Sequence, residues 1–105
     1  MAANAEAVNQ TAIKYVADVR SVMPIDKAFL FGSHAKGTAG EHSDIDLCFF
    51  SQSFANQRPV DVVFQLMKLA NKYRGFDIEP HVFPTSEMNN DNPFVKEVLR
   101  TGREL

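Results

Sequence analysis

Two short stretches indicate the fold of this chain: KAFLFGSHAKG at residues 27–37 and SDIDLCFF at residues 43–50. The first is an apolar run that stops at a glycine, which is typical of a buried strand ending in a sharp turn. The second alternates acidic with apolar residues, which is typical of a strand with one polar and one buried face. Together they predict two strands joined by a turn that contains a short helical segment.

The remaining elements follow from the spacing of apolar residues on either side. Helical spacing predicts a helix over 5–22 and another over 58–73, and Asn92 is a good cap for a last helix. The run 76–83 predicts a third strand, and Pro80, which has no N–H to donate, predicts that this strand either lies at a sheet edge or ends early there. This order predicts an α/β (α+β) domain with a small mixed sheet and helices packed on one face.

Composition limits the kind of protein. The 105 residues, 45% apolar and 23% charged, suffice for a single domain over 1–105. A net charge of −2 argues against direct nucleic-acid binding, which requires a basic face, and no apolar run is long enough for a membrane span. The single cysteine, Cys48, cannot form an internal disulfide and fits a reducing compartment. We therefore expect a cytoplasmic protein.

Asp44 and Asp46 are the first candidate site residues. Residues two apart in a strand point to the same face, so the two carboxylates leave one side and Ile45 leaves the other. Adjacent carboxylates repel each other unless they are solvated or share a cation, and oxygen ligands favour a hard ion such as Mg²⁺. The pair is interpreted either as a metal site or as a solvent-facing acidic strand.

The turn after the first strand could bind phosphate. Gly32 lets the backbone turn sharply and approach a ligand closely, and Ser33 offers a hydroxyl and a backbone N–H. Lys36 adds a positive charge nearby. The alternative is a plain glycine turn with a serine cap.

Asp77 and Glu79 form a second acidic pair two residues apart, in the third predicted strand. If the second and third strands are neighbours, three or four carboxylates meet, an arrangement that favours two metal ions and phosphoryl-type transfer. Two independent polar strand faces are the alternative. His81 shares the same face, either close to this cluster or as a polar residue at the strand edge.

These motifs together resemble the minimal nucleotidyltransferase family of the DNA polymerase β-like superfamily. The family pattern is a Gly-Ser turn, an Asp-x-Asp strand and a third acidic residue on a later strand. Here FGS at 31–33, SDIDL at 43–47 and IEPH at 78–81 match these three parts, and NPFVKE at 92–97 looks like the usual tail. The resemblance covers nearly the whole chain and implies the polymerase β-like nucleotidyltransferase fold.

The resemblance also implies a metal site. Asp44 and Asp46 would bind two Mg²⁺ ions, and Glu79 would bind the catalytic ion and help activate the acceptor hydroxyl. Asp77 is a rival for the third carboxylate, because spacing alone does not separate it from Glu79.

The nucleotide is implied to lie on the Gly-Ser turn. Gly32 and Ser33 would hold the triphosphate of ATP or another nucleoside triphosphate. Lys36 stands where many members carry Arg, so it supplies charge without a bidentate fork.

The activity implied is transfer of AMP from ATP to a hydroxyl, with release of pyrophosphate. Stand-alone members commonly work beside a small helical HEPN protein, which implies an antitoxin that modifies a Tyr of its partner toxin. Two alternatives remain: a non-catalytic module that neutralises its partner by contact, and transfer to a small molecule such as an aminoglycoside. A homo-oligomer also remains open.

Overall fold

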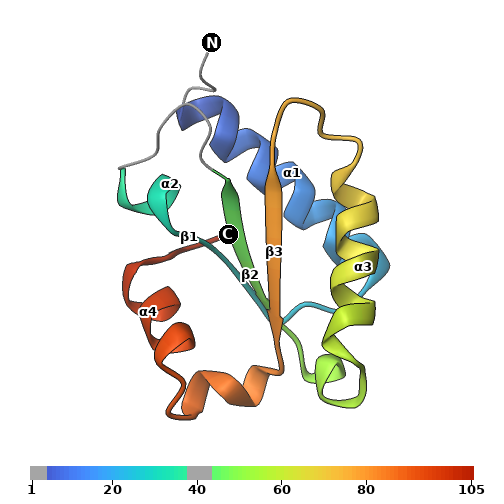
Figure 1. The fold of residues 1–105 in the computed structure, drawn as a ribbon, viewed down its shortest axis with the longest axis vertical. Helices are drawn as coiled ribbons and strands as arrows, with labels where there is room; N and C mark the ends of the chain where they lie inside the picture. The colour runs from blue at the N-terminus through green and yellow to red at the C-terminus, as the bar shows by residue number, and fades with distance from the viewer. Residues whose placement is uncertain (1–4, 38–43) are drawn as a thin grey trace.

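A four-stranded mixed sheet forms the centre of the fold, in the order β3-β2-β1-β4 (Figure 1). This computed structural model describes residues 5–37 and 44–105. The strands are β1 (Lys27–Phe31), β2 (Ile45–Phe50), β3 (Ile78–Phe83) and β4 (Arg103–Glu104). β1 is antiparallel to β2 and β4, whereas β2 and β3 are parallel. The small mixed sheet expected from the sequence is confirmed, and β3 is an edge strand as Pro80 predicted.

Helices cover both faces of this sheet. They are α1 (Ala5–Val22), α2 (Ser33–Lys36), α3 (Pro59–Ala70) and α4 (Pro93–Thr101), with 3₁₀ helices at Gln52–Asn56 and Thr85–Asn89. Figure 1 shows α3 to the right of the strands and α4 to the left. The prediction that the helices pack on one face is therefore correct for α1 and α3, whereas α4 packs on the opposite face of the sheet.

The alternation of side chains along β2 explains the two covered faces. Ile45, Leu47 and Phe49 pack into a core with buried residues of α1 and α3. Cys48 and Phe50 point the other way, into a smaller core with α4. The members of the smaller core are Phe29, Cys48, Phe50, Val95 and Val98. Because Asp46 alternates with Leu47, it shares the α4 side of the sheet.

Local signals set most element boundaries. The side chain of Asn92 accepts hydrogen bonds from the N–H groups of Phe94 (3.0 Å) and Val95 (3.3 Å), as expected of an N-cap.

The short strand β4, which the sequence did not predict, pairs Glu104 with Phe29. The later part of the predicted turn, 38–42, and Ser43 lie outside the described residues.

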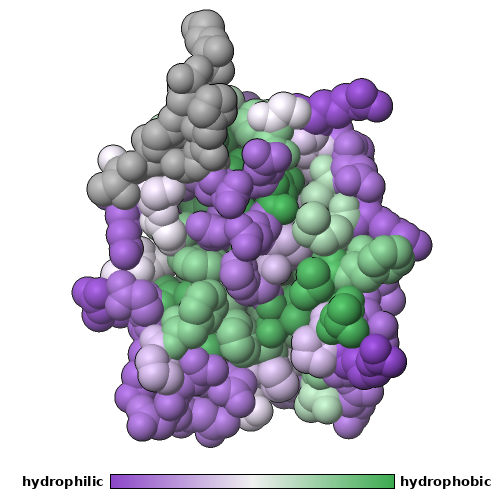
Figure 2. Space-filling model, in the orientation of Figure 1, coloured by the Kyte–Doolittle hydropathy of each residue, from purple (hydrophilic) through white to green (hydrophobic). Residues whose placement is uncertain are grey.

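An apolar stripe lies exposed on α3. Val60, Phe64 and Met67 follow helical spacing, and their side chains are 61%, 62% and 44% exposed. Figure 2 shows hydrophobic surface over this helix, on the right of the view. We refer to these three residues as the α3 stripe. Among the described residues, no helix combines the length and apolar character needed to cross a membrane.

Tyr15 links α1 to α3 through a buried hydroxyl that donates to the Leu66 carbonyl over 2.6 Å. We expect Tyr15→Phe to lower the free energy of unfolding by about 1 kcal/mol, since it removes one buried hydrogen bond and keeps the ring. Urea unfolding measures this change. Ser21→Ala is the control, because the exposed Ser21 hydroxyl bonds only within its own helix to the Asp18 carbonyl. Equal effects of the two substitutions would contradict this role of Tyr15.

Candidate functional site

The backbone of the turn after β1 approaches the Asp46 side chain closely. Gly32 has φ +75° and ψ −152°, a backbone region that is essentially restricted to glycine. A Cβ atom at Gly32 would stand 2.5 Å from Oδ2 of Asp46, which is closer than van der Waals contact allows. The glycine is therefore required both by its backbone conformation and by the neighbouring carboxylate.

Strand register brings Asp46 beside Glu79. In the β1–β2 pair Asp46 stands opposite Phe31, and in the β2–β3 pair it stands opposite Glu79. One ligand atom from each of Asp46, Glu79 and His81 lies within 4.8 Å of the other two. Nε2 of His81 is 3.9 Å from Oδ1 of Asp46. The adjoining strands β2 and β3 thus carry a cluster of three potential ligands, which we call the Asp46 cluster.

The acidic groups perturb one another. Hydrogen bonding with Asp44 raises the pKa of Glu79 above its usual range, and partial burial and the charge of Asp46 raise it further. Burial raises the pKa of Asp46; His81 opposes this shift, and the negative charge of Asp44 adds to it. Converging carboxylates with raised pKa values are destabilised when ionised, and a divalent cation relieves this repulsion. The donor set of Asp44, Asp46 and Glu79 therefore fits Mg²⁺.

The two rivals for the third carboxylate occupy different places. Glu79 belongs to the Asp46 cluster, whereas Asp77 precedes β3 and its carbonyl accepts a hydrogen bond from the Ile45 N–H at 2.7 Å. Asp77 is exposed and lines a pocket of about 340 Å³ together with Asp44 and Glu79. Figure 2 shows hydrophilic surface over the upper part of β2 and β3, which is the end where both strands begin. The register favours Glu79 as the partner of Asp46.

The residues predicted to bind phosphate lie in the turn after β1 and in α2. Ser33 begins α2, the short helical segment expected within the turn, and the Lys36 N–H donates to the Gly32 carbonyl at 3.1 Å. Nζ of Lys36 lies 3.6 Å from Oε1 of Glu97 on α4. Lys36, at the end of α2, is thus exposed and forms an ion pair with α4.

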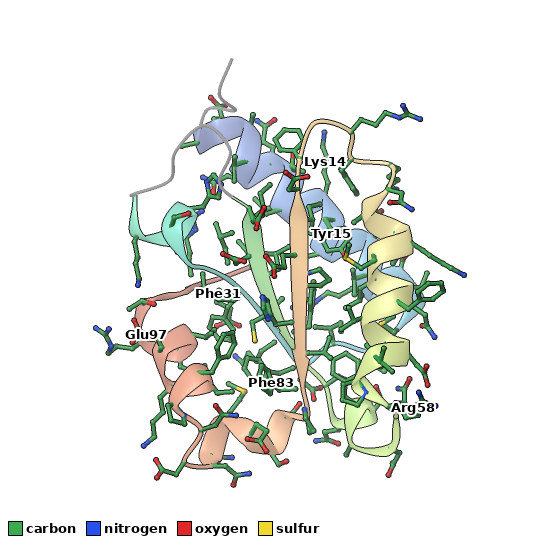
Figure 3. The ribbon with its side chains drawn as sticks, in the orientation of Figure 1. Lys14, Tyr15, Phe31, Arg58, Phe83 and Glu97 are labelled. Carbon is green, nitrogen blue, oxygen red and sulfur yellow. The ribbon has the colours of Figure 1, made fainter. Side chains whose placement is uncertain are left out.

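Aromatic rings support one side of the Asp46 cluster. The ring of His81 contacts Phe31 edge-on at 5.2 Å and Phe94 at 5.3 Å between centroids. Figure 3 shows Phe31 and Phe83 between α4 and the strands. The sequence placed His81 on the acidic face of the third strand but left its role open. Its aromatic neighbours come from distant segments, so only the tertiary structure reveals them.

Comparisons with known proteins agree with this geometry. The sequence matches the family model for the nucleotidyltransferase domain over residues 12–100. No curated protein matches the sequence.

Solved structures share the fold. A nucleotidyltransferase from Sulfolobus solfataricus is similar with a TM-score of 0.62 and 23% identity, over 81% of this chain and 74% of that chain. A toxin–antitoxin solved with AMP-PNP has a TM-score of 0.62 and 22% identity, over 90% of this chain and 69% of that chain. A mutant of the toxin–antitoxin MntA-HpeT has a TM-score of 0.62 and 24% identity, over 90% and 70%.

The sequence match and the architecture support the same assignment. The matched region runs from the middle of α1 to the end of α4, and so includes the Gly32 turn, the Asp-x-Asp strand and Glu79. The similar structures share the fold of this chain, a mixed sheet with helices. The chain therefore belongs to the nucleotidyltransferase-domain family and has the polymerase β-like nucleotidyltransferase fold.

Proposed function

We propose that this chain transfers a nucleoside monophosphate, AMP from ATP, to an acceptor hydroxyl in a reaction that depends on divalent metal ions. One observation carries the proposal: Asp46 meets the Gly32 turn on one side and Glu79 on the other. A phosphate-binding turn and a metal-binding carboxylate pair must adjoin for phosphoryl-type transfer, because the metal ions contact the phosphates directly. We further propose that residues 1–105 act as a single domain in the cytoplasm.

The chemistry assigns separate tasks to the acidic residues. Asp44, Asp46 and Glu79 would hold two Mg²⁺ ions, which stabilise negative charge on the phosphates and polarise the acceptor hydroxyl. The acceptor oxygen attacks the α-phosphorus, the bond from the α-phosphorus to the bridging oxygen breaks, and pyrophosphate leaves. Glu79 is exposed beside Asp46 and takes the hydroxyl proton.

The turn and α2 hold the triphosphate in this proposal. The backbone N–H and the hydroxyl of Ser33 donate to phosphate oxygens. Lys36 exchanges its exposed ion pair with Glu97 for the charge of the triphosphate. This exchange is inexpensive, because an exposed ion pair contributes about 0–1 kcal/mol.

We propose a partner toxin of the HEPN type as acceptor, modified on a Tyr. Two of the similar solved structures are toxin–antitoxin proteins, and one of them was solved with AMP-PNP. These likenesses support a toxin–antitoxin setting and an adenine nucleotide. The α3 stripe provides an apolar surface of the kind that protein partners cover.

The deciding experiment supplies α-³²P-labelled ATP and Mg²⁺ to the chain, with and without a candidate partner, a small helical protein of the HEPN type. Label on that protein, together with pyrophosphate release, supports protein nucleotidyl transfer. Label on an added aminoglycoside instead would support the small-molecule alternative. A stable complex with no label from any nucleoside triphosphate would contradict the transferase proposal.

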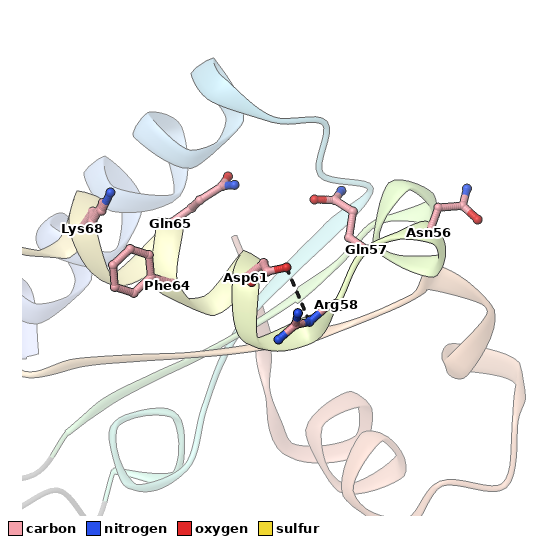
Figure 4. Close-up of a pocket in the computed structure, with 7 residues that line it drawn as sticks. All are labelled: Asn56, Gln57, Arg58, Asp61, Phe64, Gln65 and Lys68. Carbon is pink, nitrogen blue, oxygen red and sulfur yellow. Dashed lines mark ion pairs between the residues drawn. The ribbon is translucent and has the colours of Figure 1, made fainter.

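A second candidate function is neutralisation of the partner by contact alone, and the surface of α3 favours it. Phe64 of the α3 stripe also lines an open pocket of about 680 Å³ beside Arg58, Asp61 and Lys68 (Figure 4). Lys68 lies over the Phe64 ring, with Nζ 4.7 Å from its centroid. An apolar stripe bordered by charges suits a partner surface and contains no residue of the Asp46 cluster.

We expect Asp46→Asn to lower nucleotidyl transfer at least about a hundredfold, because metal stabilisation of transition-state charge is worth several kcal/mol. Its urea midpoint without metal should equal or exceed that of the parent, since the pKa of Asp46 is raised and its ionised form therefore destabilises the fold near neutral pH. Asp91→Asn, at an exposed position just before α4, is the control for charge removal. Full activity of Asp46→Asn would refute the metal assignment.

Gly32→Ala should abolish transfer and destabilise the fold, because the new Cβ would overlap Oδ2 of Asp46. Gly75→Ala is the control: Gly75 also has a positive φ, +87°, but nothing lies within 4 Å of the added Cβ. It should cost about 1–2 kcal/mol of stability and leave transfer intact. Transfer assays and urea unfolding measure both effects, and similar results for the two variants would argue against a tight contact at Asp46.

Phe64→Asp should weaken the complex with the partner protein at least about tenfold if the α3 stripe is the contact surface, because large central apolar anchors dominate binding. Calorimetric titration measures the dissociation constant. Ile13→Asp, which charges an exposed apolar residue of α1 outside the stripe, should bind normally. Unchanged binding of Phe64→Asp would exclude the α3 stripe from the interface.

A further inference from the structure

His81 is held beside the proposed metal site by its neighbours. It lies two residues after Glu79 on β3 and therefore faces the same side of the sheet, opposite Cys48 of β2. The rings of Phe31 and Phe94 contact the imidazole, and 30% of the side chain remains exposed. Apolar contacts of this kind offer no partner for a ring nitrogen, and Nε2 lies on the side of the Asp46 carboxylate.

The distance between His81 and Asp46 distinguishes a direct hydrogen bond from coordination of one metal ion by both side chains. Nε2 of His81 is 3.9 Å from Oδ1 of Asp46, which is too long for a hydrogen bond. At metal–ligand bonds of about 2.1 Å, adjacent ligand atoms of an octahedral ion lie about 3 Å apart and opposite ones about 4 Å. The separation therefore suits two ligands of one ion better than a direct hydrogen bond.

We propose that Nε2 of His81 is a direct ligand of the metal ion held by Asp46 and Glu79, and that the site therefore prefers a transition-metal ion such as Mn²⁺ to Mg²⁺. This inference rests on the proposed function, because it adds a ligand to the same site. Ligand atoms of all three residues lie within 4.8 Å of one another. Imidazole nitrogen binds first-row transition ions well, whereas Mg²⁺ is bound through oxygen.

The choice of Mn²⁺ follows from the mixed donor set. Two carboxylates and one imidazole supply both hard and borderline ligands, and Mn²⁺ accepts octahedral coordination like that of Mg²⁺. Octahedral coordination leaves positions for phosphate oxygens, as nucleotidyl transfer requires. His81 thus changes which ion the carboxylates hold while the proposed reaction stays the same.

The test measures binding of Mn²⁺ to the whole chain by electron paramagnetic resonance, without nucleotide. Spin-echo modulation then detects nitrogen bound directly to the ion. We expect nitrogen coupling in the parent and its loss in His81→Gln, whose Mn²⁺ dissociation constant should rise roughly 10- to 100-fold. Mg²⁺ should displace Mn²⁺ more readily from this variant than from the parent. His34→Gln, the same change on α2, should retain the nitrogen signal.

The outcomes separate the two proposals. Mn²⁺ that binds to the parent without nitrogen coupling, or keeps that coupling in His81→Gln, overturns the role of His81 and leaves the carboxylate site standing. If neither Mn²⁺ nor Mg²⁺ binds to the parent, both this inference and the metal-dependent function fail. Circular dichroism checks the fold of each variant, and His81→Asn provides the same comparison should His81→Gln unfold.

Discussion

The contact between the Gly32 turn and the Asp46 carboxylate is the constraint on which the rest of the site depends. A Cβ at Gly32 would lie 2.5 Å from Oδ2 of Asp46, so the turn can close over β2 only with glycine there. That closeness brings the turn that leads into α2 next to the Asp46 carboxylate on the inner strand β2. A phosphate bound at the turn and a cation bound at the carboxylate would therefore meet without any movement of the strands.

The strand β2 serves two purposes because its side chains alternate. Ile45, Leu47 and Phe49 are buried against α1 and α3, and this burial stabilises the central strand. The opposite face begins with Asp46 and continues into the apolar contacts of Cys48 and Phe50 beneath α4. Burial also raises the pKa of the Cys48 thiol to about 12, so the thiol stays neutral and packs as a small apolar group. The polar site is thus confined to one end of a well-packed face.

Electrostatics links stability to the proposed chemistry. Hydrogen bonding with Asp44 and partial burial raise the pKa of Glu79, and burial raises the pKa of Asp46, so the ionised cluster opposes folding at neutral pH. A divalent cation reverses this balance by giving the converging charges a shared partner. The fold tolerates this charge repulsion because the larger apolar core, on the opposite face of β2, contains no residue of the Asp46 cluster.

Local spacing in the sequence was enough to predict α1, β1, the end of β2 at Phe50 and the Asn92 cap, because helix and strand periods and capping residues act within a few positions. It also predicted Asp44 and Asp46 on one strand face, whereas β2 begins at Ile45 and Asp44 lies just before it. Only the tertiary structure brought Glu79 opposite Asp46 and moved α4 to the second face. It also set His81 among Phe31 and Phe94. Strand register and helix placement depend on packing between segments far apart in the chain, which local spacing does not encode.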